Sequence, residues 1–312
     1  MFTPIYSAMG WILKELYEIL DKIGVGSFAL AIIVFTVLIN VIFLPININQ
    51  QKTTAKQTAI RPKLDALKEK CGDDRQKYSV EMQELYQREN VKMMGGCLPQ
   101  LIRLPFLWGV WQAIRSPLSY IINVDDAIIE KGKNAVLALE EFAGKKIAQV
   151  TELDVIHYFD DIKSNAGLDQ LEDAIKSIDF NLFGIIDLTK TPEFTFRFSS
   201  LSGSDLLLWL IPIFSFATAM LSSVVMMNIQ KKTNPDAASM GGMMLMMPIL
   251  SLVIAFGVPA AVGFYWACSN VVTMIISIIM NKLLGPYVII AKDEAKTVKE
   301  RRQKEKSLEI KL

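Results

Sequence analysis

Apolar residues gather in five long stretches of the chain, at 28–46, 98–114 (with an extension to 122), 206–227, 243–258 and 260–284. A helix needs about 20 apolar residues to cross the hydrocarbon core of a bilayer. Only helices satisfy all backbone hydrogen bonds within one segment in lipid. The pattern therefore predicts an all-α membrane protein with five transmembrane helices. The fourth stretch is short, and Gly257-Val258-Pro259 forms a tight turn before the fifth.

The first 25 residues combine an apolar stripe with charges. The stripe has helical spacing and comprises Met9, Ile12, Leu16, Ile19 and Ile23. This pattern is typical of an amphipathic helix that lies along the membrane surface. A sixth span is the alternative, and it would place five charged side chains in lipid. The N-terminus lacks the pattern of a cleaved secretory signal.

Lysine and arginine set the orientation of the spans, because cytoplasmic loops carry an excess of them. Segment 47–95 holds ten and the tail after residue 281 holds nine, whereas segment 123–205 has 16 acids against eight bases. The N-terminus is therefore predicted outside and the C-terminus inside. The resulting division is an outer amphipathic helix (1–25), spans at 26–46, 96–122, 206–229, 243–258 and 259–284, a cytoplasmic helical hairpin (47–95), an outer, partly helical loop (123–205), a cytoplasmic loop (230–242) and a basic cytoplasmic tail (285–312).

Two polar segments show helical patterns of their own. In the hairpin, Arg61-Pro62 suits the start of a helix, and residues 71–74 (Cys-Gly-Asp-Asp) interrupt the pattern. In the outer loop, residues 148–159 and 168–178 have helical periodicity, with Gly144 and Gly167 as breaks. We expect a small helical domain there.

Arg103 is a charged residue inside the second apolar stretch, and no apolar stretch contains Asp or Glu to neutralise it. A charge at that depth is costly unless it lines a polar cavity. Asn40 on the first span and Arg103 on the second both lie six residues from the cytoplasmic end, roughly 9 Å deep. Gln100 is one turn nearer the cytosol than Arg103. A shared pocket is one interpretation; the alternative is that Arg103 extends to the phosphates and Asn40 bonds a neighbouring helix.

Methionines cluster at the inner ends of the third and fourth spans, at positions 226, 227, 240, 243, 244, 246 and 247. Flexible methionine side chains suit a surface that accepts many apolar sequences; ordinary packing is equally compatible. The composition, with 52% hydrophobic residues and a mean hydropathy of +0.32, agrees with a membrane protein. Three cysteines and one histidine, His157, show no metal-ligand or catalytic spacing. We therefore expect no enzyme activity, metal or cofactor.

Three motifs in order resemble the YidC/Oxa/Alb family of membrane protein insertases. They are residues 36–46 (TVLINVIFLPI), 96–105 (GCLPQLIRLP) and 256–270 (FGVPAAVGFYWACSN). The resemblance covers roughly residues 25–120 and 180–290. We expect no counterpart of the large outer β-sandwich domain of Gram-negative relatives. The resemblance implies a bacterial plasma-membrane insertase and chaperone with a hydrophilic groove open to cytosol and lipid, formed by Arg103, Asn40 and Gln100. It also implies substrate contacts at Met226, Met243, Tyr265 and Trp266.

The chain departs from the family at the groove. The family typically carries arginine at the position of Asn40 and glutamine at the position of Arg103. We interpret this as an exchange that moves the positive charge across the groove to the facing helix.

The resemblance also implies the partners: nascent membrane proteins, the lipid bilayer, the Sec translocon and the signal recognition particle machinery. The basic tail suits ribosomal RNA or anionic lipid equally well. The rival function is a secondary transporter or channel with a cationic intramembrane site. That class predicts acidic coupling residues or two matching halves, and the sequence has neither.

Overall fold

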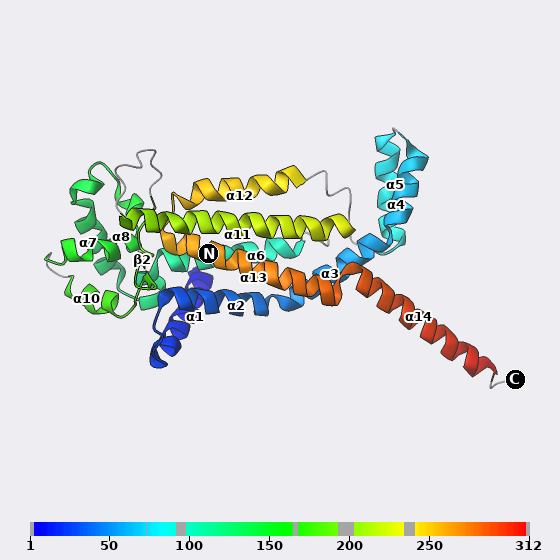
Figure 1. The fold of residues 1–312 in the computed structure, drawn as a ribbon, viewed down its shortest axis with the longest axis horizontal. Coiled ribbons are helices and arrows are strands. Elements are labelled where there is room, and N and C mark those ends of the chain that lie inside the picture. The colour runs from blue at the N-terminus through cyan, green and yellow to red at the C-terminus, as the bar shows by residue number, and fades with distance from the viewer. Residues whose placement is uncertain are drawn as a thin grey trace. The chain divides into compact units, whose positions relative to one another are not determined.

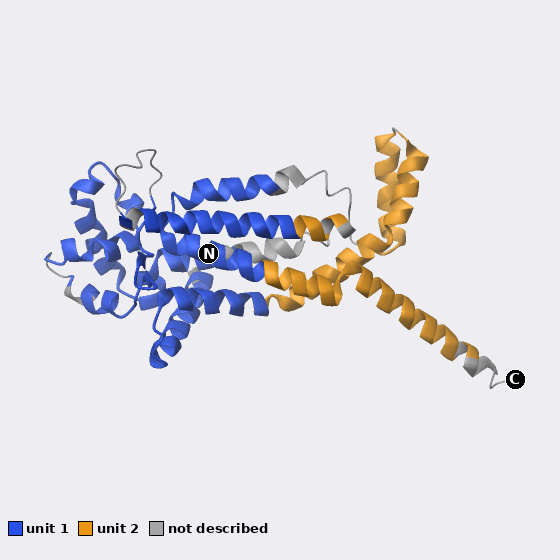
Figure 2. Ribbon diagram, in the orientation of Figure 1, with its two compact units in different colours: residues 1–41, 103–225, 241–273 blue, residues 42–102, 226–240, 274–312 orange. Residues whose placement is uncertain are grey.

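The computed structural model describes residues 3–72, 74–91, 98–164, 168–192, 203–233 and 241–309. Nearly all of the described secondary structure is helical (Figure 1). The chain divides into two compact units (Figure 2). Unit 1 holds residues 1–41, 103–225 and 241–273, and unit 2 holds residues 42–102, 226–240 and 274–312.

The apolar stretches of the sequence coincide with helices. These are α2 (Phe28–Ile42), α6 (Leu98–Arg115), α11 (Gly203–Thr233), α12 (Gly241–Ala255) and α13 (Ala260–Leu284). By length and composition, two described helices can cross a membrane, with spans that begin at Leu206 and at Ala260, or three if the bent pair α2 and α3 (Leu44–Ala59) is one span. The predicted all-α class and the transmembrane character of the chain are confirmed, and the count of five spans stays a prediction.

The first predicted span, 26–46, contains a bend. Helix α2 ends at Ile42, and α3 begins at Leu44 after a bend of 49°. Pro45 stands in the first turn of α3. Proline has no backbone N–H to continue a helix, and its ring clashes with the carbonyl four residues earlier, so the helix breaks just before it.

The outer module, defined as residues 126–190, folds as short helices that end in a small hairpin. They are α7 (Asp126–Leu137), η2 (Glu140–Phe142), η3 (Ile147–Gln149), α8 (Glu152–His157), α9 (Phe159–Ile162), α10 (Asp169–Lys176), β1 (Asn181–Leu182) and β2 (Ile186–Asp187). The strands pair antiparallel. The segment 148–159, which shows helical periodicity in the sequence, contains the end of η3, all of α8 and the start of α9. Thr151 caps the start of α8, because its hydroxyl accepts a hydrogen bond from the Asp154 amide, and this divides the segment.

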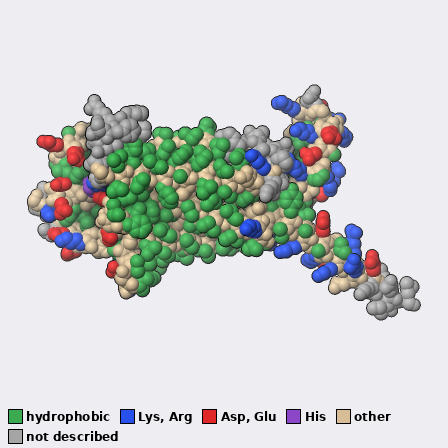
Figure 3. Space-filling view, viewed as in Figure 1, with side chains coloured by type: hydrophobic (Ala, Val, Ile, Leu, Met, Phe, Trp, Pro, Cys, Tyr) green, Lys and Arg blue, Asp and Glu red, His purple; other side chains and the backbone are tan. Residues whose placement is uncertain are grey.

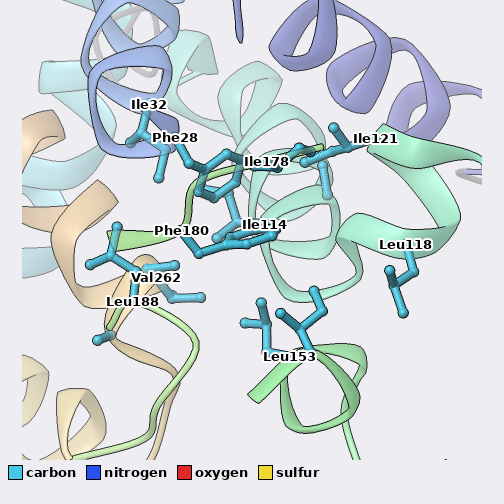
Figure 4. Close-up of a cluster of buried hydrophobic side chains, with 14 of the residues drawn as sticks. Phe28, Ile32, Ile114, Leu118, Ile121, Leu153, Ile178, Phe180, Leu188 and Val262 are labelled. Atoms are coloured by element: carbon cyan, nitrogen blue, oxygen red, sulfur yellow. The ribbon is translucent and has the colours of Figure 1, made fainter. Parts of the chain in front are cut away.

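The core of unit 1 joins the outer module to the ends of the spans. Figure 4 shows Phe28 and Ile32 of α2, Ile114 of α6, Leu153 of α8 and Val262 of α13 in one cluster of buried side chains. On the visible face of unit 1, apolar side chains cover the region of the long helices and charges gather over the outer module (Figure 3). Burial of apolar area drives this assembly.

Residues 178–190, which we call the strap, cap the N-terminus of α13. The Ala260 amide donates to the Lys190 carbonyl at 2.8 Å, and the Ala261 amide donates to the Leu188 carbonyl at 2.9 Å. The first amides of any helix have no partner within it. The strap supplies the missing acceptors.

The same strap caps α2. The Phe28 amide donates to the Asp179 carbonyl at 3.0 Å, and the ring of Phe28 packs on that of Phe180 with centroids 4.9 Å apart. The Asp179 amide in turn donates to the hydroxyl of Tyr17 on α1 (Thr3–Lys22) at 3.0 Å. Three separate helices thus meet on one strap.

Unit 2 contains α3, the hairpin helices α4 (Arg61–Cys71) and α5 (Arg75–Arg88), and the long α14 (Pro286–Glu309). Helix α4 begins at Arg61 with Pro62 in its first turn, where the sequence predicted a helix start. The Asp74 side chain caps α5 by accepting from the Lys77 amide at 3.0 Å. An ion pair between Lys70 and Glu81, 3.1 Å apart, links the two hairpin helices.

Gly10 allows α1 to lie directly on the π-helix η1 (Leu118–Ile122). A Cβ on residue 10 would lie 2.1 Å from the carbonyl oxygen of Tyr120, too close for any side chain. We predict that Gly10→Ala lowers the free energy of unfolding by about 1–3 kcal/mol, because backbone must shift to admit the methyl group. Thermal unfolding of the purified protein in a neutral detergent measures the change.

The matched control is Gly203→Ala at the start of α11, where an added Cβ meets nothing within 4 Å. It should change the unfolding free energy by less than about 0.5 kcal/mol. Equal stability of the two variants would contradict the packing of α1 on η1.

Candidate functional site

The structure places the three predicted groove residues on two helices. Arg103 and Gln100 lie on α6, and Asn40 lies on α2. The side chains of Arg103 and Gln100 are outside the described part of the structure, as is that of Met243 on α12. The pocket predicted between Asn40 and Arg103 therefore stays a prediction.

Asn40 continues a ladder of polar side chains along α2. The Thr36 hydroxyl donates to the Ile32 carbonyl at 2.7 Å, and the Asn40 amide nitrogen donates to the Thr36 carbonyl at 2.9 Å. Asn40 is half-buried. Its side-chain oxygen accepts no hydrogen bond from the part of the chain that the structure describes.

The other predicted contacts differ in burial. Tyr265 on α13 is buried, with 6% of its surface exposed, and Trp266 next to it is half-buried. The ring of Trp266 packs on Trp111 of α6 at 6.4 Å, and Trp111 packs on Trp108 at 5.1 Å. Met226 on α11 is half-buried. Tyr265 is therefore placed for packing, and Trp266 and Met226 keep an accessible part.

A polar cluster between α11 and α13 escaped the sequence reasoning. Ser215 and Thr218 on α11 are buried, and the Asn270 amide nitrogen of α13 lies 3.5 Å from both the Ser215 carbonyl and the Thr218 hydroxyl. The helices approach closely because Gly263 faces Ile211, whose methyl would lie 3.1 Å from an added Cβ. Interhelical polar contacts of this kind hold membrane helices together. Two residues in the sequence could have indicated this helix contact: the small Gly263 and the amide side chain of Asn270.

A cavity of about 830 Å³, which we call the outer cavity, lies between the outer module and the ends of the long helices in unit 1. Its walls are Trp111, Arg115, Glu141, Phe142, Lys145, Gln149, Thr151, Asp154, His157, Tyr158, residues 189–192, Leu208, Trp209 and residues 257–259. No sequence pattern indicated this cavity, because its lining comes from segments almost 150 residues apart.

One wall of the outer cavity is stiffened by a network around Asp187 at the end of the hairpin. His157 Nδ1 lies 2.9 Å from one oxygen of Asp187, and the amide and hydroxyl of Thr189 both donate to the other oxygen. Burial raises the pKa of Asp187, but the hydrogen bonds from His157 and Thr189 lower that pKa by more, so it falls below the ordinary 3.8. The carboxylate is charged at neutral pH and fixes the strap to α8.

A second carboxylate anchors the module to η1. The amide and hydroxyl of Ser119 both donate to Glu152, which is 3% exposed. Burial raises the pKa of Glu152, and the hydrogen bonds from Ser119 oppose that rise. Among the described residues no group of histidine, cysteine and acidic side chains could hold a metal ion.

Long apolar helices, internal polar ladders and a charged outer module together define an α-helical integral membrane protein. Residues 19–286 match the family model described as 60Kd inner membrane protein. The chain belongs to this family, and it is an inner-membrane protein. The resemblance to the YidC/Oxa/Alb family is thereby confirmed.

Two relatives illustrate the similarity. The membrane protein insertase YidC of Pseudomonas fluorescens (strain Pf-5) is 43% identical over 107 residues, and that of Ectopseudomonas mendocina is 41% identical over 107 residues. In each case the matched part is 34% of this chain and 18% of the relative. The chain thus matches less than a fifth of the length of these relatives.

The Asp187 network makes a pH-dependent prediction. Because the folded-state pKa is lowered, its stabilisation is present above the unfolded-state pKa and is lost as the pH falls through the folded-state value. We expect Asp187→Asn to lower the free energy of unfolding by about 1.5 kcal/mol at pH 7. The difference from the unmodified chain should shrink below about pH 4. Chemical unfolding at several pH values measures it.

Asp160→Asn is the control, because Asp160 is an exposed carboxylate paired with Lys163 at 2.8 Å. Its loss should leave stability at pH 7 essentially unchanged, since solvent and salt screen exposed pairs. A gap between wild type and Asp187→Asn that stays constant down to pH 2.5 would contradict the assigned role of the carboxylate.

Proposed function

We propose that the chain is a membrane protein insertase that moves short polar segments of nascent proteins across part of the bilayer. The observation that carries the proposal is the family match over residues 19–286. Relatives in two species are named as insertases of this kind. Arg103, a cationic residue in the apolar helix α6, supplies a positive charge that can attract the acidic tail of a substrate.

The barrier to insertion is the removal of water from polar groups. Unsatisfied polar groups cost several kcal/mol each in hydrocarbon, and charges cost more. In our proposal, Arg103, Gln100 and Asn40 line a groove that admits water part-way into the membrane from the cytosol. The side-chain oxygen of Asn40 supports this, because a dry interface between helices would leave that oxygen buried without a partner.

Arg103 would attract acidic tails of substrates. Coulomb attraction between opposite charges grows as the local dielectric falls. A cation at this depth without acidic neighbours in the apolar stretches is suited to this role, since an acidic partner would neutralise it. The hydrophobic segment of the substrate then leaves toward lipid along α11 and α13, and burial of apolar surface drives that last step.

The topology belongs to the same proposal. Five spans, with the N-terminus outside and the C-terminus inside, place the outer module on the far side from the cytosol and the hairpin α4–α5 with α14 in the cytosol. The basic residues of 47–95 and of the tail support this orientation. The short apolar helix at Leu245–Ala255 would require a locally thinner bilayer, which shortens the path for a polar tail.

The cytoplasmic elements would receive the substrate. Helix α14 carries the basic tail and packs on α3 around the buried Ala55. We infer that the hairpin and α14 contact the ribosome, the targeting machinery or the Sec translocon. The chaperone activity implied by the resemblance belongs to the same role.

Reconstituted vesicles test the function. Purified chain in liposomes should insert a one-span substrate with an acidic outer tail, measured as the fraction protected from added protease. Arg103→Ala should reduce insertion about tenfold, because a charge-assisted contact is worth about 1.5 kcal/mol or more. The exchange variant, Asn40→Arg with Arg103→Gln, should restore insertion, since the charge then lies on the facing helix.

Lys131→Ala is the matched control, because Lys131 is an exposed base on α7 of the outer module, outside the elements proposed to receive the substrate. It should insert normally, and a substrate with a neutral tail should depend little on Arg103. Normal insertion of the acidic substrate by Arg103→Ala would rule out the groove charge. Passage of small solutes without insertion would favour a channel or transporter instead.

A further inference from the structure

We propose that the outer cavity binds the headgroup of a phospholipid that carries both a phosphodiester and a primary ammonium group. At about 830 Å³ the cavity falls in the range of roughly 300–1,000 Å³ that small-molecule sites occupy. Nothing in the insertase mechanism uses this cavity, because the proposed groove lies toward the opposite ends of α2 and α6.

The bases nearest the spans have no protein partner. Arg115 is the last residue of α6, and Lys190 lies on the strap that caps α13. Both are half-buried, and neither forms an ion pair or side-chain hydrogen bond with any residue that the structure describes. Half-buried cations without partners favour an anionic ligand, and arginine in particular matches the planar arrangement of phosphate oxygens.

The acids lie on two short helices of the outer module, Glu141 on η2 and Asp154 on α8. Glu141 accepts from the hydroxyl of Tyr158, and Asp154 accepts from the amide and hydroxyl of Thr151. These bonds fix both carboxylates in place and leave each with further lone pairs to accept an ammonium group. Lys145 also lines the cavity, but it stacks on the Phe142 ring at 4.1 Å.

The order of these charges matches the order of groups in a phospholipid. Arg115 at the end of α6 and Lys190 beside the start of α13 adjoin the ends of the long helices, whereas Glu141 and Asp154 lie on η2 and α8 of the outer module. A phospholipid presents acyl chains, then the phosphodiester, then the terminal ammonium. Leu208 and Trp209 line the cavity on α11, and Leu206, Leu207 and Leu210 of the same helix are exposed. The acyl chains therefore have apolar surface that adjoins the headgroup site, which a soluble anion would not need.

Native mass spectrometry of the full chain from a neutral detergent tests the site. The probes are phosphatidylethanolamine, phosphatidylglycerol and diacylglycerol with matched acyl chains. The unmodified chain should retain phosphatidylethanolamine at least about fivefold better than the other two. Arg115→Gln combined with Lys190→Gln should reduce that retention about tenfold, because two charge-assisted contacts are lost. Glu141→Gln should remove the preference over phosphatidylglycerol.

Lys131→Gln is the control, since Lys131 is an exposed lysine of α7 that does not line the cavity. It should retain lipid as the unmodified chain does, and thermal unfolding confirms that each variant is folded. Three results would overturn the proposal. They are equal retention of phosphatidylglycerol, displacement of the lipid by millimolar inorganic phosphate, and unchanged retention of phosphatidylethanolamine in the double variant.

Discussion

The first backbone amides of α2 and α13 need hydrogen-bond acceptors from outside their own helices, and the architecture of unit 1 depends on this requirement. A helix cannot bond its own first amides, and each unsatisfied group near lipid costs several kcal/mol. The strap satisfies them with the carbonyls of Asp179, Leu188 and Lys190. Because Asp187 and its hydrogen bonds hold the strap on α8, the outer module and the span ends form one packed body. The outer cavity is a consequence, since it lies where the module and the helix ends meet.

The features that could be predicted from the sequence are those encoded in contiguous stretches of residues, such as helices and helix starts. The apolar stretch at 260–284 is helix α13, and Arg61-Pro62 does begin α4. The all-α class and the family were likewise accessible, because composition and three short motifs carry them. The bend at Phe43 did have a sequence signal, Pro45 within an otherwise apolar run, although we predicted no bend from it. The sequence could not reveal the strap, because a backbone carbonyl leaves no mark in the sequence of the helix that it caps.

The candidate groove and the outer cavity also depend on contacts between distant segments, which could not be predicted from the sequence. The residue types at 40, 100 and 103 predicted a chemistry, since charge and depth can be read along one helix. The contacts among those side chains depend on helix packing, and the structure describes only the Asn40 part. The outer cavity was invisible because Arg115, Asp154 and Lys190 are unremarkable singly; only the fold brings them together. In our proposals, substrate enters at the groove on one side of the membrane, and the outer cavity binds lipid on the other side.

The central claim is that position 103 faces a nascent chain in a hydrated groove. Site-specific photocrosslinking tests it most directly, with a photoreactive residue at position 103 and a ribosome-stalled membrane substrate. We expect a crosslink from position 103 to the substrate, and none from position 11, where Trp11 is exposed on the outer helix α1. Crosslinks from position 103 to lipid alone would show that this position does not face a nascent chain.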